Sequence, residues 1–485
     1  MRRILLTSIV LLSILSGTIS AQRSNGKPTR PRPAPAKPSA PVPPPDAAIS
    51  REDFKIGYVN RRLSNGLEVI VYPDSAVPLV TVELAVRNGS FTEPPELNGL
   101  SHLYEHMFFK PNGAVLRGEQ YLKDIGQLGI TYNGTTREEV VNYYFTTTKD
   151  YFETAVRFVK DAARYPTFDP DELEQEKQVV IGEIDRNESN PFFYLNRTLM
   201  DKLYYKYPTR KNPLGTRETV LSATTEKMRL IQGRYYVPNN SAVVITGDVD
   251  PEAAFKMVEK YFGDWERRAV DPFKEFPLVE HPPLAKSSGY VVEQPIQNVL
   301  IQIGWHGPSI GKDNEATYAA DVFSYIISQP DSRFQRNLVD SGLVLGVDFG
   351  YYTQRNVGPI VLTLVTTPER AKAALKAAYA EVAQFDKPGY FTDTELENAK
   401  TMLEARDLFE REKLTEYAHT LSFWWSSTGI DYFRGYHTTM RSIKRADTDR
   451  YLRTYVLGKP HITVALMSTR SKTAAGLTTQ DLIGN

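Results

Sequence analysis

The sequence predicts an α+β protein built from two homologous halves, on three observations. The chain has 485 residues, more than one hydrophobic core usually supports, so two domains of about 200 residues each are expected. Apolar residues at 80, 82, 84 and 86 alternate with their neighbours at the two-residue period of a half-buried strand. Residues 168–177 and 391–400 share a phenylalanine, the run Glu-Leu-Glu and a lysine at identical spacing, which indicates an internal duplication.

Turn and helix signals place the other elements of the first half in chain order. Asn65-Gly66 predicts a hairpin turn, and a helix opens after Gly99, directly behind a strand. Pro170 suits the first turn of a helix that ends before Pro191. The predicted strands are 68–71, 80–86, 141–145 and 242–245, and the predicted later helices are 171–188 and 251–262.

The last strand of the first half has a counterpart at the end of the second half. Tyr-Val precedes a strand at 242–245 in the first half and again at 462–465 in the second. The stretch 266–286 is rich in proline and charge, which is typical of a linker. We therefore expect an N-terminal domain at 54–265 and a C-terminal domain at 287–485.

The first 53 residues are expected to lie outside these domains. Arg2 and Arg3, a short apolar run and the small residues Ser20 and Ala21 are typical of a cleavable secretory signal peptide at 1–21. Residues 22–53 are rich in proline and predict an extended linker. The protein is then periplasmic or secreted, with no stable membrane span; a retained membrane anchor is the alternative.

The composition excludes some classes of partner and of metal ligand. The 58 Lys and Arg residues balance 58 Asp and Glu residues, so we expect no binding of nucleic acid through a basic groove. Cysteine is absent, so disulfides are excluded and any metal must be held by histidine and carboxylate.

Two of the seven histidines are spaced for joint metal binding in the string His102-Leu103-Tyr104-Glu105-His106. Positions i and i+4 share one face of a helix, so both imidazoles can reach one ion while Glu105 points toward the same space. This order, H-x-x-E-H, is that of a zinc hydrolase. The other five histidines have no partner at this spacing and are assigned no chemistry.

A catalytic zinc site needs a third protein ligand and leaves the fourth position for water. The helix at 171–188 carries many carboxylates, most of which suit a solvated face. Glu176 and Glu183 differ, because Val179 and Val180 lie three or four positions from each, on the face that should turn inward. A carboxylate there is costly unless a cation neutralises it.

The strings GLSHLYEHMFFKP at 99–111 and EKQVVIGEIDRNESNP at 176–191 resemble the pitrilysin/insulysin family of inverzincin metallopeptidases, which includes the mitochondrial processing peptidase. The resemblance implies that His102, His106 and Glu183 bind one Zn²⁺ per chain, that Glu105 is the general base, and that Glu176 is a supporting catalytic carboxylate. It also implies that each half is a mostly antiparallel sheet with helices on one face, arranged as half of a clamshell.

The second half is expected to be degenerate. It lacks H-x-x-E-H, and aligning the repeated helices sets Ala399 opposite Glu176 and Arg406 opposite Glu183. Many family members carry an arginine and a tyrosine in this half that hold the substrate, but Val339 and Leu345 stand at those positions here. A homologous partner subunit could supply the missing pair, so we expect a dimer, with a heterodimer preferred and a homodimer possible. Arg336, Tyr351 and Tyr352 are local substitutes that ordinary surface or core roles explain better.

Asn133 resembles the first residue of the family's Asn-Ala-x-Thr stretch, which lies along the edge strand that receives the peptide; glycine replaces the alanine here. We expect it to bind substrate, with a loop asparagine beside a turn glycine as the alternative. The expected function is a zinc-dependent endopeptidase that hydrolyses peptides or unfolded polypeptide segments, with zinc-bound water activated by Glu105. The alternatives are a non-catalytic scaffold or assembly subunit of a homologous two-chain complex, and a purely structural zinc.

Overall fold

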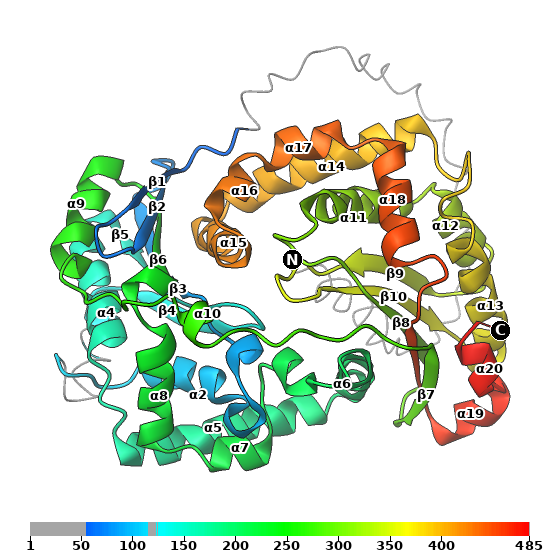
Figure 1. Ribbon diagram of the computed structural model, residues 1–485, viewed down its shortest axis with the longest axis horizontal. Helices are drawn as coiled ribbons and strands as arrows, with labels where there is room; N and C mark the ends of the chain where they lie inside the picture. The colour runs from blue at the N-terminus through cyan, green and yellow to red at the C-terminus, as the bar shows by residue number, and fades with distance from the viewer. Residues whose placement is uncertain (1–54, 115–122, 124, 485) are drawn as a thin grey trace, which may run out of the picture. The chain divides into compact units, whose positions relative to one another are not determined.

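Two sheets organise the chain in the computed structural model, which describes residues 55–114, 123 and 125–484 (Figure 1). The expected signal peptide and the expected proline-rich linker lie outside the described residues. The first sheet has the strand order β1-β2-β6-β3-β5-β4, in which only β2 and β6 are parallel neighbours. Its strands are β1 (Val59–Arg62), β2 (Glu68–Pro73), β3 (Leu79–Val86), β4 (Thr131–Thr136), β5 (Val141–Thr148) and β6 (Ser241–Gly247).

The second sheet repeats five strands of the first in the same order. It runs β7-β11-β8-β10-β9, with the parallel pair β7–β11 at the place of β2–β6 and antiparallel pairs elsewhere. Its strands are β7 (Ser288–Glu293), β8 (Val299–His306), β9 (Gly346–Tyr351), β10 (Pro359–Thr366) and β11 (Ile462–Met467). The expected α+β fold of two homologous, mostly antiparallel halves is thereby confirmed.

The repeated helices are equivalent in detail. Helices α5 (Pro170–Glu188) and α14 (Asp393–Arg411) each have 19 residues. In α5 the buried Lys177 donates a hydrogen bond to Glu174, and in α14 the buried Lys400 donates to Glu397 at the equivalent positions. The helices therefore preserve one packing arrangement in two copies.

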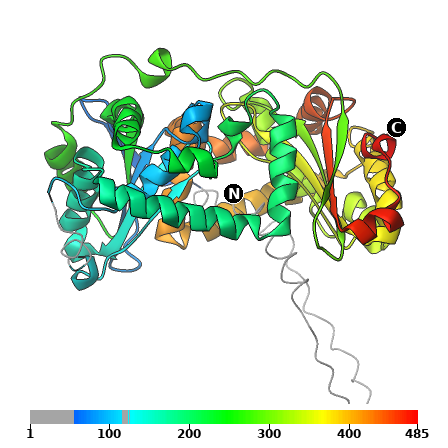
Figure 2. The ribbon, with the colours of Figure 1, turned by 90° about the horizontal axis from the view of Figure 1, so that it is seen from below.

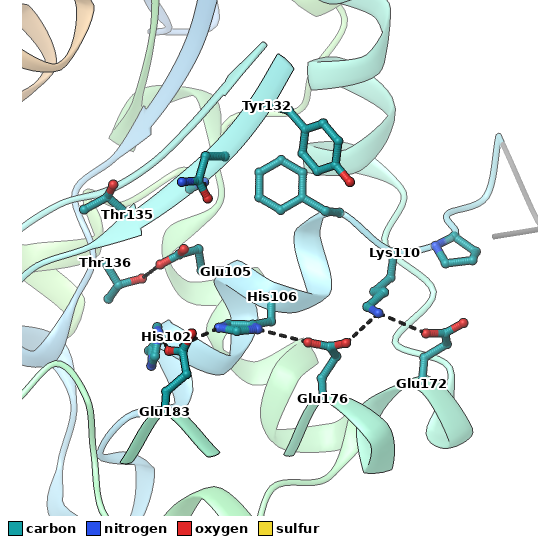
Figure 3. A pocket seen from close by; sticks show the side chains of 14 residues that line it. His102, Glu105, His106, Lys110, Tyr132, Thr135, Thr136, Glu172, Glu176 and Glu183 are labelled. Atoms are coloured by element: carbon teal, nitrogen blue, oxygen red, sulfur yellow. Dashed lines mark hydrogen bonds and ion pairs between the residues drawn. The ribbon is translucent and has the colours of Figure 1, made fainter. Parts of the chain in front are cut away.

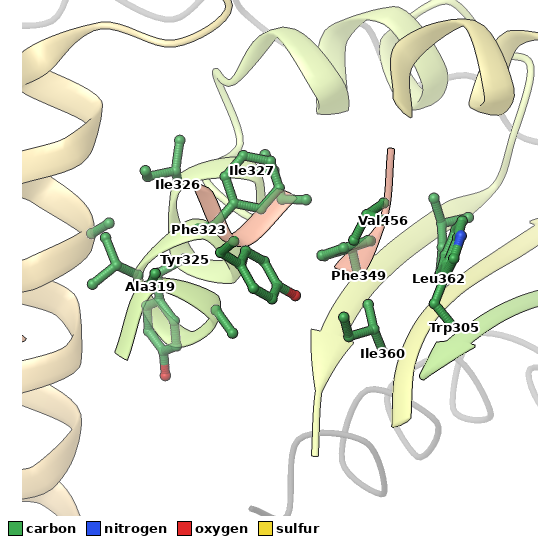
Figure 4. Packing of buried hydrophobic residues seen from close by; sticks show 14 of the residues in the cluster. Trp305, Ala319, Phe323, Tyr325, Ile326, Ile327, Phe349, Ile360, Leu362 and Val456 are labelled. Atoms are coloured by element: carbon green, nitrogen blue, oxygen red, sulfur yellow. The ribbon is translucent and has the colours of Figure 1, made fainter. Parts of the chain in front are cut away.

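Each sheet is covered on one face by helices of its own half. Val69 and Val71 of β2 belong to a core shared with α4 (Phe152–Arg164) and α9 (Pro251–Phe262). Trp305 of β8 and Phe349 of β9 pack with Phe323 of α11 (Asn314–Ile327) in the second core (Figure 4). These large side chains are almost fully buried, so each contributes about 1.5–3 kcal/mol of hydrophobic stabilisation.

The opposite face of each sheet is covered by a helix of the other half. Helix α15 (Leu414–Ser427) packs on β3 and β6, and α6 (Pro191–Leu203) packs on β8 and β11 (Figure 1). A Cβ atom added to Gly304 of β8 would lie 2.9 Å from Leu199 Cδ1 of α6, so this glycine permits the close approach. Each half has the expected helices on one face of its sheet; in addition, each sheet has on its second face a helix that comes from the other half.

The exchanged helix α15 makes buried polar contacts with the first sheet. His419 Nδ1 lies 2.5 Å from Glu83 Oε2 on β3, and Asn142 donates to the other oxygen of Glu83 at 2.7 Å. Thr246 donates from β6 to the carbonyl oxygen of Leu414 at 2.8 Å. Hydrogen bonds of this kind fix the angle of α15 on the sheet, because each buried polar group has to keep its partner.

The expected linker at 266–286 includes the short helix α10 (Pro272–Glu275), and the chain then runs extended to β7 (Figure 2). Asn356 donates to the carbonyl oxygen of Val279 at 2.9 Å, which ties this extended segment to the second half. The domain boundaries at 54, 265, 286 and 485 stay predictions.

The remaining helices complete the layers around the sheets, and none within the described ranges is long and apolar enough to cross a membrane. They are α2 (Leu100–Phe108), α7 (Arg217–Leu221), α8 (Thr225–Tyr235), α12 (Arg333–Gln335), α13 (Ala371–Val382), α16 (Ile430–Arg434), α17 (Tyr436–Ser442), α18 (Arg445–Tyr455), α19 (Thr469–Ala475) and α20 (Thr479–Leu482).

Candidate metal centre

Helix α2, which carries both motif histidines, has a buried acidic cap at its N-terminus. Glu93 accepts hydrogen bonds from the main-chain nitrogens of Gly99 and Ser101 at 2.7 and 2.6 Å. These nitrogens have no partner inside the helix, and a negative charge there also suits the helix dipole. Gly99 adopts φ 86°, and a Cβ atom on it would lie 2.5 Å from Gly215 Cα. The glycine is therefore required where the motif helix begins.

Helix α5 supplies the acidic side of the centre. Asp169 caps it by accepting from Asp171 N and Glu172 N, and Pro170 occupies the first turn as expected. Glu176 and Val180 lie on its buried face, as predicted. The inward orientation expected for Val179 is wrong, since this side chain is 48% exposed; it lies about 100° around the helix from Val180.

His102, His106 and Glu183 come together from the two helices (Figure 3). Glu183 Oε2 lies 3.3 Å from His102 Nε2 and 3.9 Å from His106 Nε2. One ligand atom from each residue lies within 4.8 Å of the other two. Among the described residues, these three form the one cluster of histidine and acidic side chains that could hold a metal ion. Ligands about 2.0–2.1 Å from a tetrahedral zinc stand about 3.3 Å apart; the Glu183–His102 pair matches this spacing, and the Glu183–His106 pair is wider.

Glu176 contacts the far side of the histidine ring. His106 Nδ1 donates to Glu176 Oε2 at 2.9 Å, which leaves Nε2 facing Glu183. Lys110 Nζ lies 2.5 Å from Glu176 Oε1 and 3.3 Å from Glu172 Oε2 (Figure 3). Burial opposes ionisation of Glu176, but the hydrogen bonds from His106 and Lys110 lower its pKa overall. A charged carboxylate here orients the imidazole for a metal.

Glu105 lies beside the trio on the same helix and faces the edge strand β4. Burial raises its pKa, while His102 and a hydrogen bond from Thr136 act in the opposite direction. The Thr136 hydroxyl donates to Glu105 Oε2 at 2.6 Å. A carboxylate with a raised pKa is suited to take up a proton and to give it away near neutral pH.

These groups line one pocket of about 590 Å³. Its aromatic wall is Phe109 and Tyr132, whose ring centroids lie 5.0 Å apart, and Asn133 lines the strand side. The side-chain oxygen of Asn133 accepts from Gly134 N at 2.9 Å. Of the two phenylalanines after the motif, Phe108 is buried in the core and Phe109 reaches the pocket.

The second-half positions discussed above stay away from this pocket. Val339 packs beside the second core, and Leu345 is 51% exposed. Tyr351 donates its hydroxyl to the carbonyl oxygen of Pro308 at 2.9 Å, and neither Arg336 nor Tyr352 is among the residues that line the pocket. At the position equivalent to Glu183, Arg406 donates to Tyr325 and Glu410.

Sequence reasoning assigned no role at the centre to Glu93, Lys110, Gly134 or Thr136, although the last two lie in the stretch compared with Asn-Ala-x-Thr. The two-residue period of a strand could have placed Gly134 and Thr136 on the face toward Glu105. No pattern pointed to Glu93, because a cap six residues before its helix depends on how the loop folds back.

Two family models match consecutive parts of the chain. They are "Insulinase (Peptidase family M16)" over residues 69–217 and "Peptidase M16 inactive domain" over residues 222–403. The chain is similar to the uncharacterised zinc protease YmxG of Bacillus subtilis, at 25% identity over 70% of this chain and 81% of that protein. It is also similar to the zinc protease PqqE of Helicobacter pylori, at 22% identity over 87% of this chain and 95% of that protein.

Solved structures share the fold. A protease from Helicobacter pylori superposes with a TM-score of 0.76 at 21% identity, over 84% of this chain and 99% of that chain. The periplasmic protease PqqL from Escherichia coli gives a TM-score of 0.69 at 15% identity, over 88% of this chain and 49% of that chain. With both models matched in chain order on a duplicated fold, the chain belongs to the pitrilysin/insulysin family of M16 peptidases.

Proposed function

We propose that this protein is a zinc-dependent endopeptidase that hydrolyses peptides or unfolded polypeptide segments. One observation carries the proposal: Glu183 Oε2 faces the Nε2 atoms of His102 and His106, and Glu105 lines the same pocket. Two imidazoles and one carboxylate are a ligand set of catalytic zinc, whereas a structural zinc ordinarily has four protein ligands. The names of the relatives, which include several zinc proteases, support the same metal.

His102, His106 and Glu183 would hold the ion. Zinc in such a site supplies Lewis acidity, which eases deprotonation of water near neutral pH and polarises a peptide carbonyl. Glu105 accepts a proton from the attacking water through its carboxylate, and its partial burial strengthens the interaction with that proton. When the peptide C–N bond breaks, Glu105 gives the proton to the departing amine.

The peptide is proposed to bind along β4, the edge strand of the first sheet. Among the described residues β4 pairs with β5 alone, so its outer edge can pair with an extended chain. Asn133 lies on this strand and lines the pocket. Main-chain pairing makes few demands on side chains, which suits a peptidase that accepts unfolded segments.

A homologous partner subunit is proposed to complete the active enzyme. Val339 and Leu345 cannot donate hydrogen bonds, and losing one donor to a developing oxyanion typically costs several kcal/mol of barrier. We prefer a heterodimer to a homodimer, in the periplasm or outside the cell. The alternative is a non-catalytic subunit of a two-chain complex; the match to a model named for an inactive domain covers residues 222–403, which do not include the candidate metal ligands, and is compatible with both roles.

The test measures bound metal and cleavage of a quenched fluorescent peptide, first for this chain alone and then with a neighbouring homologous chain. We expect one zinc per chain and peptide cleavage at full rate only with the partner; full-rate cleavage by the chain alone would refute the need for a partner. Glu105→Gln should keep the zinc and lose nearly all turnover, because it removes the proton acceptor and keeps the ligands. A zinc-loaded complex without cleavage would support the scaffold role, and an active Glu105→Gln variant would remove the assignment of the base.

A further inference from the structure

A threonine on the edge strand holds the carboxylate of Glu105. Thr136 Oγ1 donates to Glu105 Oε2 at 2.6 Å, although the two residues lie on different elements, β4 and α2. Because side chains alternate along a strand, Tyr132, Gly134 and Thr136 share the face of β4 that turns toward α2. Figure 3 shows the Thr136 hydroxyl directed at the carboxylate of Glu105.

Gly134 brings the strand itself against the same side chain. A Cβ atom at this position would lie 2.6 Å from Glu105 Cγ and 2.9 Å from Glu105 Oε1. Atoms this close overlap, so the missing side chain is what lets Glu105 lie over the main chain of β4. The strand therefore limits the carboxylate at both oxygens, by a hydrogen bond at Oε2 and by close packing at Oε1.

We propose that Thr136 is a positioning residue for Glu105, and that β4 serves both as the seat of the peptide and as the support of the base. The proposal rests on the proposed peptidase function. The Thr136 hydroxyl holds Glu105 Oε2 by a hydrogen bond, which leaves Oε1 to accept the proton of the attacking water. A glutamate has three side-chain torsions, and without this bond the carboxylate would spread over several rotamers.

The arrangement also couples substrate binding to the base. Thr136 is the last residue of β4, and its main chain pairs with Val141 of β5, the one neighbour of this strand within the described part of the chain. A peptide that pairs with the free edge of β4 would restrict the strand's motion and thereby the motion of the Thr136 hydroxyl. We therefore expect loss of this hydroxyl to slow the chemical step much more than it weakens peptide binding.

The experiment compares Thr136→Val, which keeps the side-chain volume and loses the donor, with Thr136→Ser, which keeps the donor. It uses the zinc-loaded protein with its partner subunit where activity requires one. For Thr136→Val we expect kcat to fall about 10- to 100-fold, with KM within about twofold of the wild type. Thr136→Ser should keep most of kcat. Zinc content and the midpoint of thermal unfolding should stay close to those of the wild type in both variants.

Thr147→Val provides a matched control on the neighbouring strand β5. Thr147 is buried and donates to the carbonyl oxygen of Leu128 at 3.3 Å, away from the pocket. The Thr147→Val variant also loses a threonine hydroxyl that donates a hydrogen bond in the first sheet, but it should keep the wild-type kcat. A fall in kcat as large as that of Thr136→Val would show that any such loss disturbs the sheet, and would overturn the proposal.

Two further outcomes separate this inference from the proposed function. If the wild type cleaves peptides, Glu105→Gln does not, and Thr136→Val keeps the wild-type kcat, the positioning role is wrong and the peptidase function stands. If Glu105→Gln stays active, Glu105 is not the base and the positioning role falls with that assignment, whereas a wild type that binds no zinc and cleaves no peptide would refute the proposed function itself. Equal loss in Thr136→Ser and Thr136→Val, or a crystal structure of Thr136→Val with Glu105 unmoved, would also overturn the proposal, because the hydroxyl would then not be what holds the base.

Discussion

Replacing Glu176 by glutamine tests whether a carboxylate behind His106 stabilises the metal site. The change keeps the size of the side chain and one oxygen that can accept from His106 Nδ1, which now donates at 2.9 Å. It removes the negative charge of Glu176, which the hydrogen bonds from His106 and Lys110 stabilise by lowering its pKa, and which orients the imidazole. Lys110, 2.5 Å from Glu176, also loses its nearer carboxylate.

The magnitude follows from the position of Glu176 behind a ligand. Outer contacts to a metal-binding histidine typically contribute 10- to 100-fold in metal affinity, which is about 1.4–2.7 kcal/mol. Glu176 is only 10% exposed, so solvent screens its charge little. We therefore expect Glu176→Gln to weaken zinc binding about 10- to 100-fold in competition with a chelator, with the fold unchanged by circular dichroism.

Glu172→Gln is the matched control. Glu172 contacts the same lysine at 3.3 Å and is 30% exposed, whereas the carboxylate that bonds to His106 is that of Glu176. Its zinc affinity should stay within about threefold of the wild type, since a partly exposed ion pair contributes little. Equal affinities for Glu176→Gln and the wild type, or equal losses in the two variants, would refute the argument that the His106–Glu176 bond orients the ligand.

Two other predictions concern the third ligand and the contact between the halves. Glu183→Ala should weaken zinc binding by more than about 100-fold, beyond the effect of any outer contact; full zinc occupancy in the variant would point to a different ligand. Burial lowers the pKa of His419, but the neighbouring Glu83 raises it by more, so the pKa of the folded protein lies above the unfolded value of about 6.5. The His419–Glu83 pair therefore stabilises the fold fully below the unfolded pKa. This stability is lost as pH rises through the folded pKa. His419→Gln should therefore reduce the free energy of unfolding by about 1–3 kcal/mol at pH 6 and by less at pH 9 in denaturant titrations; equal losses at both pH values would contradict the contribution of a charged His419.

The local elements and the duplication could be predicted because their signals lie within short windows of sequence. Pro170 and the capping Asp169 mark the start of α5, and the period of two marks β3. The exchange of α6 and α15 between the halves could not be predicted. Helix α15 buries apolar residues such as Leu421 and also binds β3 through His419, and nothing local says which sheet such a helix covers.

The candidate centre shows the same division between local and distant information. His102, Glu105 and His106 follow from helical spacing alone, because four residues make about one turn. Glu183 needed the family resemblance, since its distance from the motif says nothing about how α5 crosses α2. Thr136 and Lys110 reach the centre from a strand and from the end of α2, and only the packed structure brings their polar atoms within hydrogen-bonding distance.

The duplicated helix explains why the chain has its metal ligands in one half. Leu173 and Val180 of α5 correspond to Leu396 and Leu403 of α14, and all four are buried, so both copies keep the residues that pack. At the metal-facing positions, by contrast, Ala399 and Arg406 replace Glu176 and Glu183. The Arg406 guanidinium donates to the Tyr325 hydroxyl at 3.1 Å and to Glu410 Oε1 at 2.8 Å, and a fixed cation there repels a divalent ion. The packing residues and the metal-facing residues alternate along one side of the helix, so the second copy could replace Glu176 by the buried Ala399 and Glu183 by Arg406 and still keep the leucines that pack.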